Sequence, residues 1–243
     1  MCPDNVSNNV SYEQIKKNTV QAANQLKEND HVTFENPTGK GVRVLFVGNS
    51  ITRHGAAPAI GWHNDCGMAA SSKEKDYVHL LMARINAVNE DAAYCICQAA
   101  EWERKYKAGT EKLHDLFEGA HDFAADIIIM RLIENCSFAE WDSQIFKKEL
   151  ENLIAYFDSD KKAKVIITNG FWHHCGDEAI KDFAEANNIP FVELGDLGEL
   201  DEMKAVGLFE HSGVAAHPGD LGMKMIADRI YEKIESTMRK IYV

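Results

Sequence analysis

The feature that most constrains this chain is a series of five short apolar runs, rich in β-branched residues, separated by longer segments. The runs cover residues 42–47, 92–98, 125–131, 163–169 and 189–194. Such runs are typical of strands buried on both faces of a sheet, and strands that alternate with helices indicate right-handed parallel crossovers. We therefore expect an α/β fold, a three-layer αβα sandwich around a flavodoxin-like five-stranded parallel sheet of order 2-1-3-4-5.

The segments between the runs have helical spacing of apolar residues and recognisable helix starts. Ser71 with Glu74, and Ser137 with Glu140, have the spacing of capping boxes. They predict helices over residues 72–89 and from 137 to 157. Further helices are expected up to residue 119, over 177–187, and from Pro218 to about residue 239.

The first apolar run ends in Gly48, Asn49 and Ser50. Glycine permits a tight turn and asparagine tolerates left-handed dihedral angles, so the Ser50 hydroxyl would emerge at the carboxyl edge of the sheet. A serine there, with a histidine partner elsewhere, is the minimum that acyl transfer requires. The structural alternative is a strand followed by a polar turn.

Other chemically useful residues follow the later strands. We expect them to meet Ser50 at one edge, because parallel strands end on the same side of a sheet. They are Ala99 and Ala100 after the second run, Asn135 after the third, Trp172, His173 and His174 after the fourth, and His217 before the last helix. A hydroxyl, an amide and an imidazole are what ester hydrolysis needs: a nucleophile, a base and donors for the developing oxyanion.

In these blocks, over roughly residues 42 to 235, the chain resembles the SGNH (GDSL-like) hydrolases. The residues around Gly48 and Ser50 are similar to the first block of that family, those ending at Asn135 to the third, and Gly213 to His217 to the last. The resemblance implies that Ser50 is the nucleophile and His217 the general base. It also implies that the Ser50 N–H and the Asn135 amide donate to the oxyanion.

The chain departs from the family pattern at several positions. Asn49 stands where many members have aspartate, Ile133 replaces the glycine of the third block, and Ala99 or Ala100 stands for the second-block glycine, with Ala100 as the predicted third oxyanion donor. The aspartate that usually orients the histidine is replaced by Val214. A carboxylate from Glu210, Glu134 or Asp220, or a backbone carbonyl, can hold the imidazole instead, or the enzyme works as a Ser-His dyad.

Aromatic and polar residues near the same edge suggest the kind of substrate. Trp62 and Trp172 lie in loops at the predicted site, and flat aromatic faces suit sugar rings. With Asn49 and Glu134 they are the predicted substrate contacts, although Glu134 can equally form a structural ion pair with Arg131. We expect removal of a small acyl group, such as acetyl, from a carbohydrate or similar molecule. The alternatives are a lipase or thioesterase of the same family and a catalytically silent carbohydrate-binding or scaffolding domain.

Composition excludes other classes of partner. The formal net charge is −12 and no basic patch appears, which argues against nucleic acid and anionic membranes. No apolar run approaches the ~20 residues that cross a bilayer. Phosphate-loop and dinucleotide fingerprints are missing, so no cofactor is expected. Six cysteines without paired spacing favour a reducing, cytoplasmic setting, and we expect no zinc site at His63, Cys66, Cys136, His173, His174 and Cys175.

Residues 1–40 stand apart from the hydrolase-like domain at 41–243. A stripe from Tyr12 to Leu26 predicts one helix, and residues 31–34 predict a short strand. This extension is too small to fold alone. We expect it to pack on the main domain or on a second subunit, which would make the protein a homo-oligomer.

Overall fold

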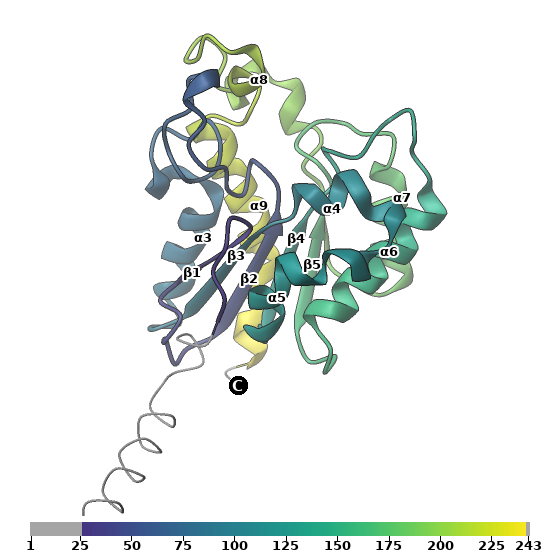
Figure 1. Ribbon diagram of the computed structural model, residues 1–243. Coiled ribbons are helices and arrows are strands. Elements are labelled where there is room, and N and C mark those ends of the chain that lie inside the picture. Colours follow the sequence, from purple (N-terminus) through teal and green to yellow (C-terminus); the bar gives the residue numbers. More distant parts are fainter. Residues whose placement is uncertain (1–25, 242–243) are drawn as a thin grey trace, which may run out of the picture.

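The computed structural model describes residues 26–241, with side chains as far as residue 235. A central sheet of order β1-β3-β2-β4-β5-β6 lies between two layers of helices (Figure 1). The strands are β1 (Val32–Glu35), β2 (Arg43–Gly48), β3 (Ala93–Gln98), β4 (Ile127–Arg131), β5 (Lys164–Thr168) and β6 (Phe191–Val192). The α-helices are α3 (Tyr77–Asn86), α4 (Ala100–Lys105), α5 (His114–Asp122), α6 (Ser143–Phe157), α7 (Asp177–Ala186), α8 (Ser212–Ala215) and α9 (Asp220–Ile241). The 3-10 helices are η1 (Pro58–Ile60), η2 (Lys73–Lys75), η3 (Tyr106–Ala108), η4 (Thr110–Leu113), η5 (Leu197–Glu199) and η6 (Asp201–Met203).

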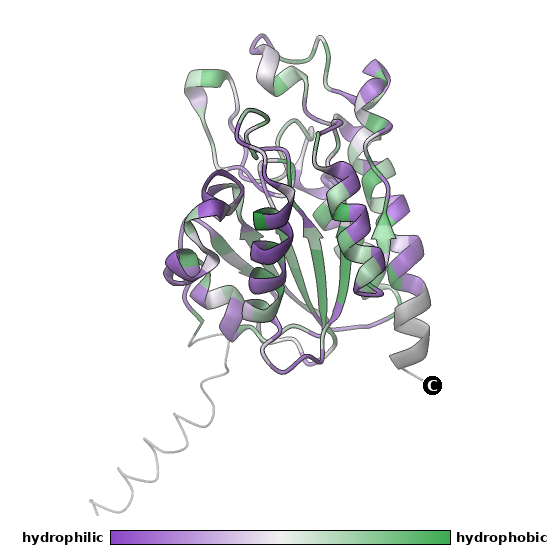
Figure 2. Cartoon of the chain, turned by 90° about the vertical axis from the view of Figure 1, so that its right-hand side faces the viewer, coloured by the Kyte–Doolittle hydropathy of each residue, from purple (hydrophilic) through white to green (hydrophobic). Residues whose placement is uncertain are grey.

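The central strands bury both faces, as their apolar sequences predict. In β2, Val44 and Phe46 pack with α3 and α9, whereas Leu45 and Val47 pack with α4 to α7 on the opposite face. Figure 2 shows the strands as a hydrophobic layer, with hydrophilic residues on the outer faces of the helices. The three-layer αβα architecture is therefore confirmed.

The prediction of a five-stranded, wholly parallel sheet is wrong, because β1 adds a sixth strand at the edge. It pairs antiparallel with β3, with Val32 opposite Cys97 and Glu35 opposite Tyr94. The link from β1 to β2 is too short for a parallel crossover, which takes a dozen residues or more. The five parallel strands, β3-β2-β4-β5-β6, follow one another in the spatial order expected for the flavodoxin-like part.

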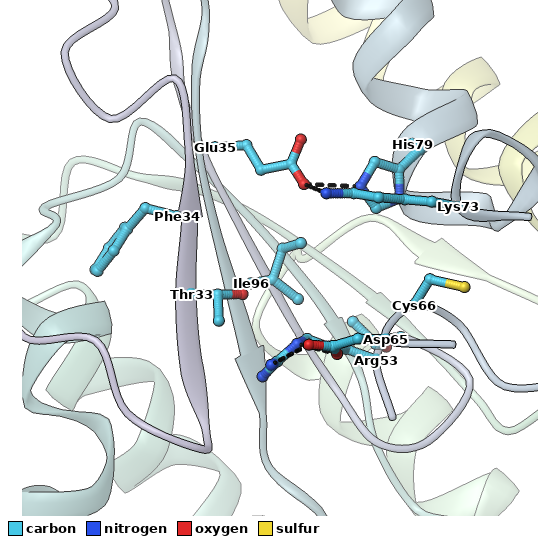
Figure 3. Close-up of a pocket in the computed structure, with 10 residues that line it drawn as sticks. Thr33, Phe34, Glu35, Arg53, Asp65, Cys66, Lys73, His79 and Ile96 are labelled. Atoms are coloured by element: carbon cyan, nitrogen blue, oxygen red, sulfur yellow. Dashed lines mark hydrogen bonds and ion pairs between the residues drawn. The ribbon is translucent and has the colours of Figure 1, made fainter. Parts of the chain in front are cut away.

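A polar cluster ties β1 to the helical layer. The Glu35 carboxylate lies 2.9 Å from His79 Nε2 on α3 and also pairs with Lys73 (Figure 3). On its other side, His79 Nδ1 lies 2.7 Å from the fully buried Asp76 carboxylate, which caps α3. The predicted short strand is thus an integral part of the sheet. The division at residue 40 stays a prediction, and the predicted helix falls almost entirely outside the described residues.

Two helices begin later than the capping-box spacings predict. Asp76, not a serine, caps α3, and its Oδ1 accepts the His79 N–H at 2.8 Å. Asp142 caps α6 by accepting the N–H groups of Gln144 and Ile145, both at 3.0 Å. Aspartate is as good a cap as serine, so the competing aspartates set both helix starts.

Two further facts concern the whole described chain. Within residues 26–241 the helices are too short or too polar for any of them to traverse a bilayer. The cysteines in this range all carry free thiols; four are buried and Cys175 is exposed.

Candidate active site

Ser50 lies in the turn that follows β2. The turn starts at Gly48, where a Cβ atom would come within 1.9 Å of Thr52 Oγ1, so only glycine fits. The turn closes through a bond of 2.9 Å from the Thr52 N–H to the Asn49 carbonyl. It places Ser50 Oγ 2.8 Å from His217 Nε2, although 167 positions separate the two residues.

His217 is held in one orientation from both sides. Its Nδ1 lies 2.6 Å from the Gly213 carbonyl oxygen. A carbonyl can only accept, so Nδ1 carries the hydrogen and Nε2 is left to accept the Ser50 hydroxyl proton. The Trp172 ring packs edge-on against the imidazole, with 5.2 Å between ring centroids. Burial lowers the pKa of His217 to about 4, so the imidazole is neutral at pH 7.

The Gly213 carbonyl replaces the missing aspartate as the partner of His217 Nδ1. Val214, which stands in the aspartate's place, turns its side chain into a buried apolar cluster with Trp62 and Met68. Glu134 binds Arg131, and Asp220 binds Ser71 and Lys75. Glu210 is exposed. Of the proposed partners, the backbone carbonyl is the one that bonds to the imidazole.

The Asn135 amide is oriented by two charged neighbours. Its Nδ2 donates to Glu103 Oε2 at 2.6 Å, and its Oδ1 accepts from Arg104 at 3.3 Å. The flipped amide would set its oxygen against a carboxylate and its NH₂ against a guanidinium, so this orientation is the only favourable one. Asn135 therefore presents a fixed amide beside Ser50, in the cavity that both residues line.

Glu103 was not found by the sequence reasoning. It is fully buried on α4 and accepts hydrogen bonds from Asn49 Nδ2 at 2.9 Å and from the Ile133 N–H at 2.5 Å, besides Asn135. Burial, and then the charge of Glu134, raise the pKa of this carboxyl to about 7. The only signal in the sequence is an acidic residue in the helical turn after β3, which is a common solvent-exposed pattern.

Asn49 and Glu134 belong to this buried network rather than to the lining of the cavity. Asn49 is fully buried, and its Nδ2 also donates to Glu134 Oε2 at 2.6 Å while its Oδ1 accepts from Arg131. Glu134 additionally accepts the Phe171 N–H at 2.9 Å. The two residues predicted to touch substrate thus join the loops after β2, β4 and β5 behind the site.

A cavity of about 240 Å³ opens above Ser50. Ala100 lines it and donates its N–H to Gln98 Oε1 at 3.2 Å, whereas the Ala99 N–H is taken by the Gly48 carbonyl at 2.5 Å. Trp62 does not line it; the ring is 1 % exposed and packs on Phe209. The lining residues are Ser50, His54, Ile60, Met68, Gln98, Ala100, Arg104, Asn135, His211, Gly213, Val214 and His217.

Within the described part of the chain, no three or more His, Cys, Asp or Glu side chains are grouped so that they could hold a metal ion. Of the histidines considered for zinc, His174 instead lies 3.1 Å from the Cys136 carbonyl oxygen through Nε2. The exposed His173 pairs with Asp177 and Glu199.

Comparison with known proteins finds similarity in structure only. No family model and no curated protein matches the sequence. A family two carbohydrate esterase from Cellvibrio japonicus matches with a TM-score of 0.53 at 13% identity, over 83% of this chain and 62% of that one. A two-domain esterase active on acetylated mannans gives 0.52 at 16%, over 83% and 50%. An active-site mutant of a family two carbohydrate esterase from Clostridium thermocellum gives 0.52 at 11%, over 81% and 64%.

The chain spans between half and somewhat under two thirds of the length of these proteins. At such low identity the likeness concerns the fold, and it extends over most of the present chain. The resemblance expected from the sequence blocks is confirmed at the level of the fold: the chain has an α/β fold that is shared with these carbohydrate esterases.

Proposed function

We propose that the protein is a serine esterase that removes a small acyl group, most simply acetyl, from a carbohydrate. The observation that carries the proposal is the contact of 2.8 Å between Ser50 Oγ and His217 Nε2, in a histidine whose Nδ1 is held by the Gly213 carbonyl. A hydroxyl bonded to a neutral, oriented imidazole is the arrangement that activates a serine nucleophile.

The reaction follows from these groups. His217 Nε2 takes the Ser50 proton as Oγ attacks the ester carbonyl, and the negative charge on the carbonyl oxygen is received by the Ser50 N–H and the Asn135 amide. The Ala100 N–H becomes a third donor when it exchanges its bond to Gln98 Oε1 for one to the oxyanion. The tetrahedral intermediate collapses as imidazolium returns the proton to the leaving alcohol. Water, deprotonated by His217, then releases the acid and regenerates the Ser50 hydroxyl.

Two observations support a small acyl group on a sugar. The cavity of about 240 Å³ lies below the usual range for drug-sized ligands, which disfavours a long acyl chain and so the lipase alternative. Proteins of the same fold are described as carbohydrate esterases, one of them active on acetylated mannans. Trp172 does not line this cavity, but it is half-buried and packs against His217, where its ring can contact a sugar that extends beyond the cavity.

The test is the turnover of an acetyl ester by Ser50→Ala. We expect kcat/KM to fall at least ~10³-fold, because the nucleophile is lost. Ser137→Ala, at an exposed serine outside the cavity, is the matched control and should keep wild-type turnover. A fluorescent organophosphonate should label the wild type and the control but not the Ser50 variant. Near-normal turnover by Ser50→Ala would refute the assignment. Absence of labelling in the wild type, with sugar binding retained, would favour the silent binding domain.

A further inference from the structure

The cavity above Ser50 differs in charge from the rest of the protein. The chain carries 38 acidic and 26 basic residues. Among the described residues that line the cavity there is no carboxylate, but there are the Arg104 guanidinium and the imidazoles of His54, His211 and His217. An acidic protein whose ester-binding cavity presents a cation is suited to an anionic substrate.

Two buried carboxylates near the cavity do not neutralise this lining from inside. Glu103 and Glu134 lie behind the cavity, where their oxygens accept hydrogen bonds from Asn49, Asn135, Arg131 and backbone N–H groups. Their acceptor positions are directed into the buried network. The side that faces the cavity is the amide of Asn135, not a carboxylate.

Arg104 has N–H groups that remain available to bind a ligand. It follows Ala100 by one turn of α4, so the two residues share a face of that helix and both line the cavity. One guanidinium nitrogen donates to Asn135 Oδ1 at 3.3 Å, and another lies 3.8 Å from Glu101, whose carboxylate pairs more closely with Lys105. The side chain is 56 % exposed, and a guanidinium offers a planar fork of N–H groups that suits a carboxylate.

We infer that the physiological ester carries a carboxylate close to the scissile bond, as in an acylated acidic sugar, and that Arg104 binds it. The inference rests on the proposed function and narrows its substrate class. It gives Arg104 two tasks, which are to hold the Asn135 oxygen and to select the charged substrate. The two tasks predict different effects on charged and neutral esters, so they can be separated.

The experiment compares 4-acetoxybenzoate with 4-acetoxybenzamide, which differ in charge but hardly in size. We expect kcat/KM to favour the anionic ester at least about 10-fold, with the preference declining as salt is added. Phenyl hydrogen glutarate and phenyl pentanoate form a second pair, with the charge on the acyl side. A preference in the first pair alone places the carboxylate on the alcohol part, and a preference in the second alone places it on the acyl part.

Variants isolate the guanidinium. In Arg104→Gln the amide can still donate to Asn135, and the ratio of kcat/KM between anionic and neutral esters should fall to about 1. Arg104→Lys should keep part of the preference. Lys107→Gln removes an exposed cation three residues further along the chain, which does not line the cavity, and should leave the ratio unchanged. A purely structural role for Arg104 would lower both rates and leave their ratio as it is.

A binding measurement tests this inference independently of the proposed function. Ser50→Ala should bind 4-acetoxybenzoate at least about 10-fold more tightly than 4-acetoxybenzamide in calorimetry, whether or not the wild type turns either ester over. Equal binding of the charged and neutral ester within both pairs, or a ratio that Arg104→Gln leaves unchanged, overturns the inference. Charge-selective binding without hydrolysis by the wild type would instead count against the esterase proposal alone.

Discussion

At the residue scale, His217 differs from the histidine of a full triad in the partner of its Nδ1. A carboxylate stabilises the imidazolium by its charge, whereas the Gly213 carbonyl offers only a dipole. Burial is therefore the largest influence on the pKa of His217, and it lowers that pKa to about 4. His217 thus keeps the geometry of a general base, but its imidazole binds a proton more weakly than a histidine that is paired with a carboxylate.

This difference predicts the pH dependence of the proposed reaction. The neutral imidazole is the active form, and it persists until the pH falls to about 4, so kcat/KM for an acetyl ester should decline near pH 4 rather than near the ordinary value of 6.5. The measurement is a pH–rate profile, with circular dichroism at each pH to show that the fold persists. An acid limb between pH 6 and 7 would contradict the prediction.

Glu103 is predicted to act on the reaction through Asn135. Asn135→Ala should lower kcat by about 10²–10³-fold, as loss of an oxyanion donor does. Glu103→Gln sets an amide NH₂ among three hydrogen-bond donors, so Asn135 should lose its alignment and kcat should fall about 10-fold with little change in KM.

A double-mutant cycle separates this positioning role from a general loss of structure. If Glu103 acts through Asn135, Glu103→Gln should have no further effect on kcat in the Asn135→Ala background. Independent, multiplicative losses would show that Glu103 supports the site in another way.

The meeting of the three side chains proposed for catalysis could be predicted from the sequence. Ser50, His217 and Asn135 each follow a strand or open a helix at the same edge, and parallel topology brings such positions together. Asn49 and Glu134 occupy family-like positions but are consumed by buried hydrogen bonds. Glu103 could not be predicted, because its role depends on which face of α4 is buried.

At the scale of elements, the short edge strand is where sequence and structure differ most. β1 has only four residues, two of them polar, and the residues that it pairs with in β3 lie 59 to 65 positions further along the chain. A short strand signal is weak, and its partner cannot be read from local pattern. The predicted starts of two helices were wrong for a related reason: several residues near each start can cap the helix, and tertiary packing selects one of them.

The bond between β1 and α3 predicts a pH-dependent stability. Burial alone would lower the pKa of His79, but its hydrogen bonds to Asp76 and Glu35 outweigh burial and raise it to about 9. The hydrogen bond from His79 is the main cause that lowers the pKa of Glu35 to about 2. The His79 contribution is complete below pH 6.5 and lost as the pH rises through 9. The Glu35 contribution is complete above pH 4.5 and lost as the pH falls through 2.

His79→Gln should therefore lower the free energy of unfolding by about 1–2 kcal/mol between pH 4.5 and 6.5, and the deficit should shrink towards pH 10. Urea unfolding of the wild type and the variant at pH 5.5 and pH 9.5 measures it. Lys73→Gln, which removes the more exposed cation from the same carboxylate, is the control and should cost less. A deficit that is the same at both pH values would refute a role for the charged imidazole.

At the scale of the whole molecule, the two residues of the proposed catalytic pair come from the two ends of the region that resembles a hydrolase. Ser50 follows the central strand β2, and His217 lies between α8 and α9, beside the loops that follow the other strands (Figure 1). The strand order was predictable because parallel crossovers allow few topologies. The place of the sixth strand in the sheet was not predictable, since an antiparallel edge strand is not subject to the crossover rule.

Deleting residues 1–38 should destabilise the fold, because it removes β1 and uncovers the edge of β3. We expect the melting temperature to fall by at least about 5 °C relative to a deletion of residues 1–25, which keeps β1. Equal melting temperatures for the two variants would show that the strand contributes little.

The mass in solution of the shorter deletion also tests the proposed homo-oligomer: an unchanged oligomer would exclude a role for residues 1–25.

The Gly213 carbonyl has an evolutionary consequence. Every amino acid brings the same oxygen to the main chain, so no point mutation at position 213 can delete the group that steadies the imidazole; it can only be displaced by a change in the path of the chain. An alanine scan would accordingly identify no side chain that orients the imidazole of His217. In related chains, the group that orients the histidine would therefore be preserved as a backbone conformation and not as a conserved residue type.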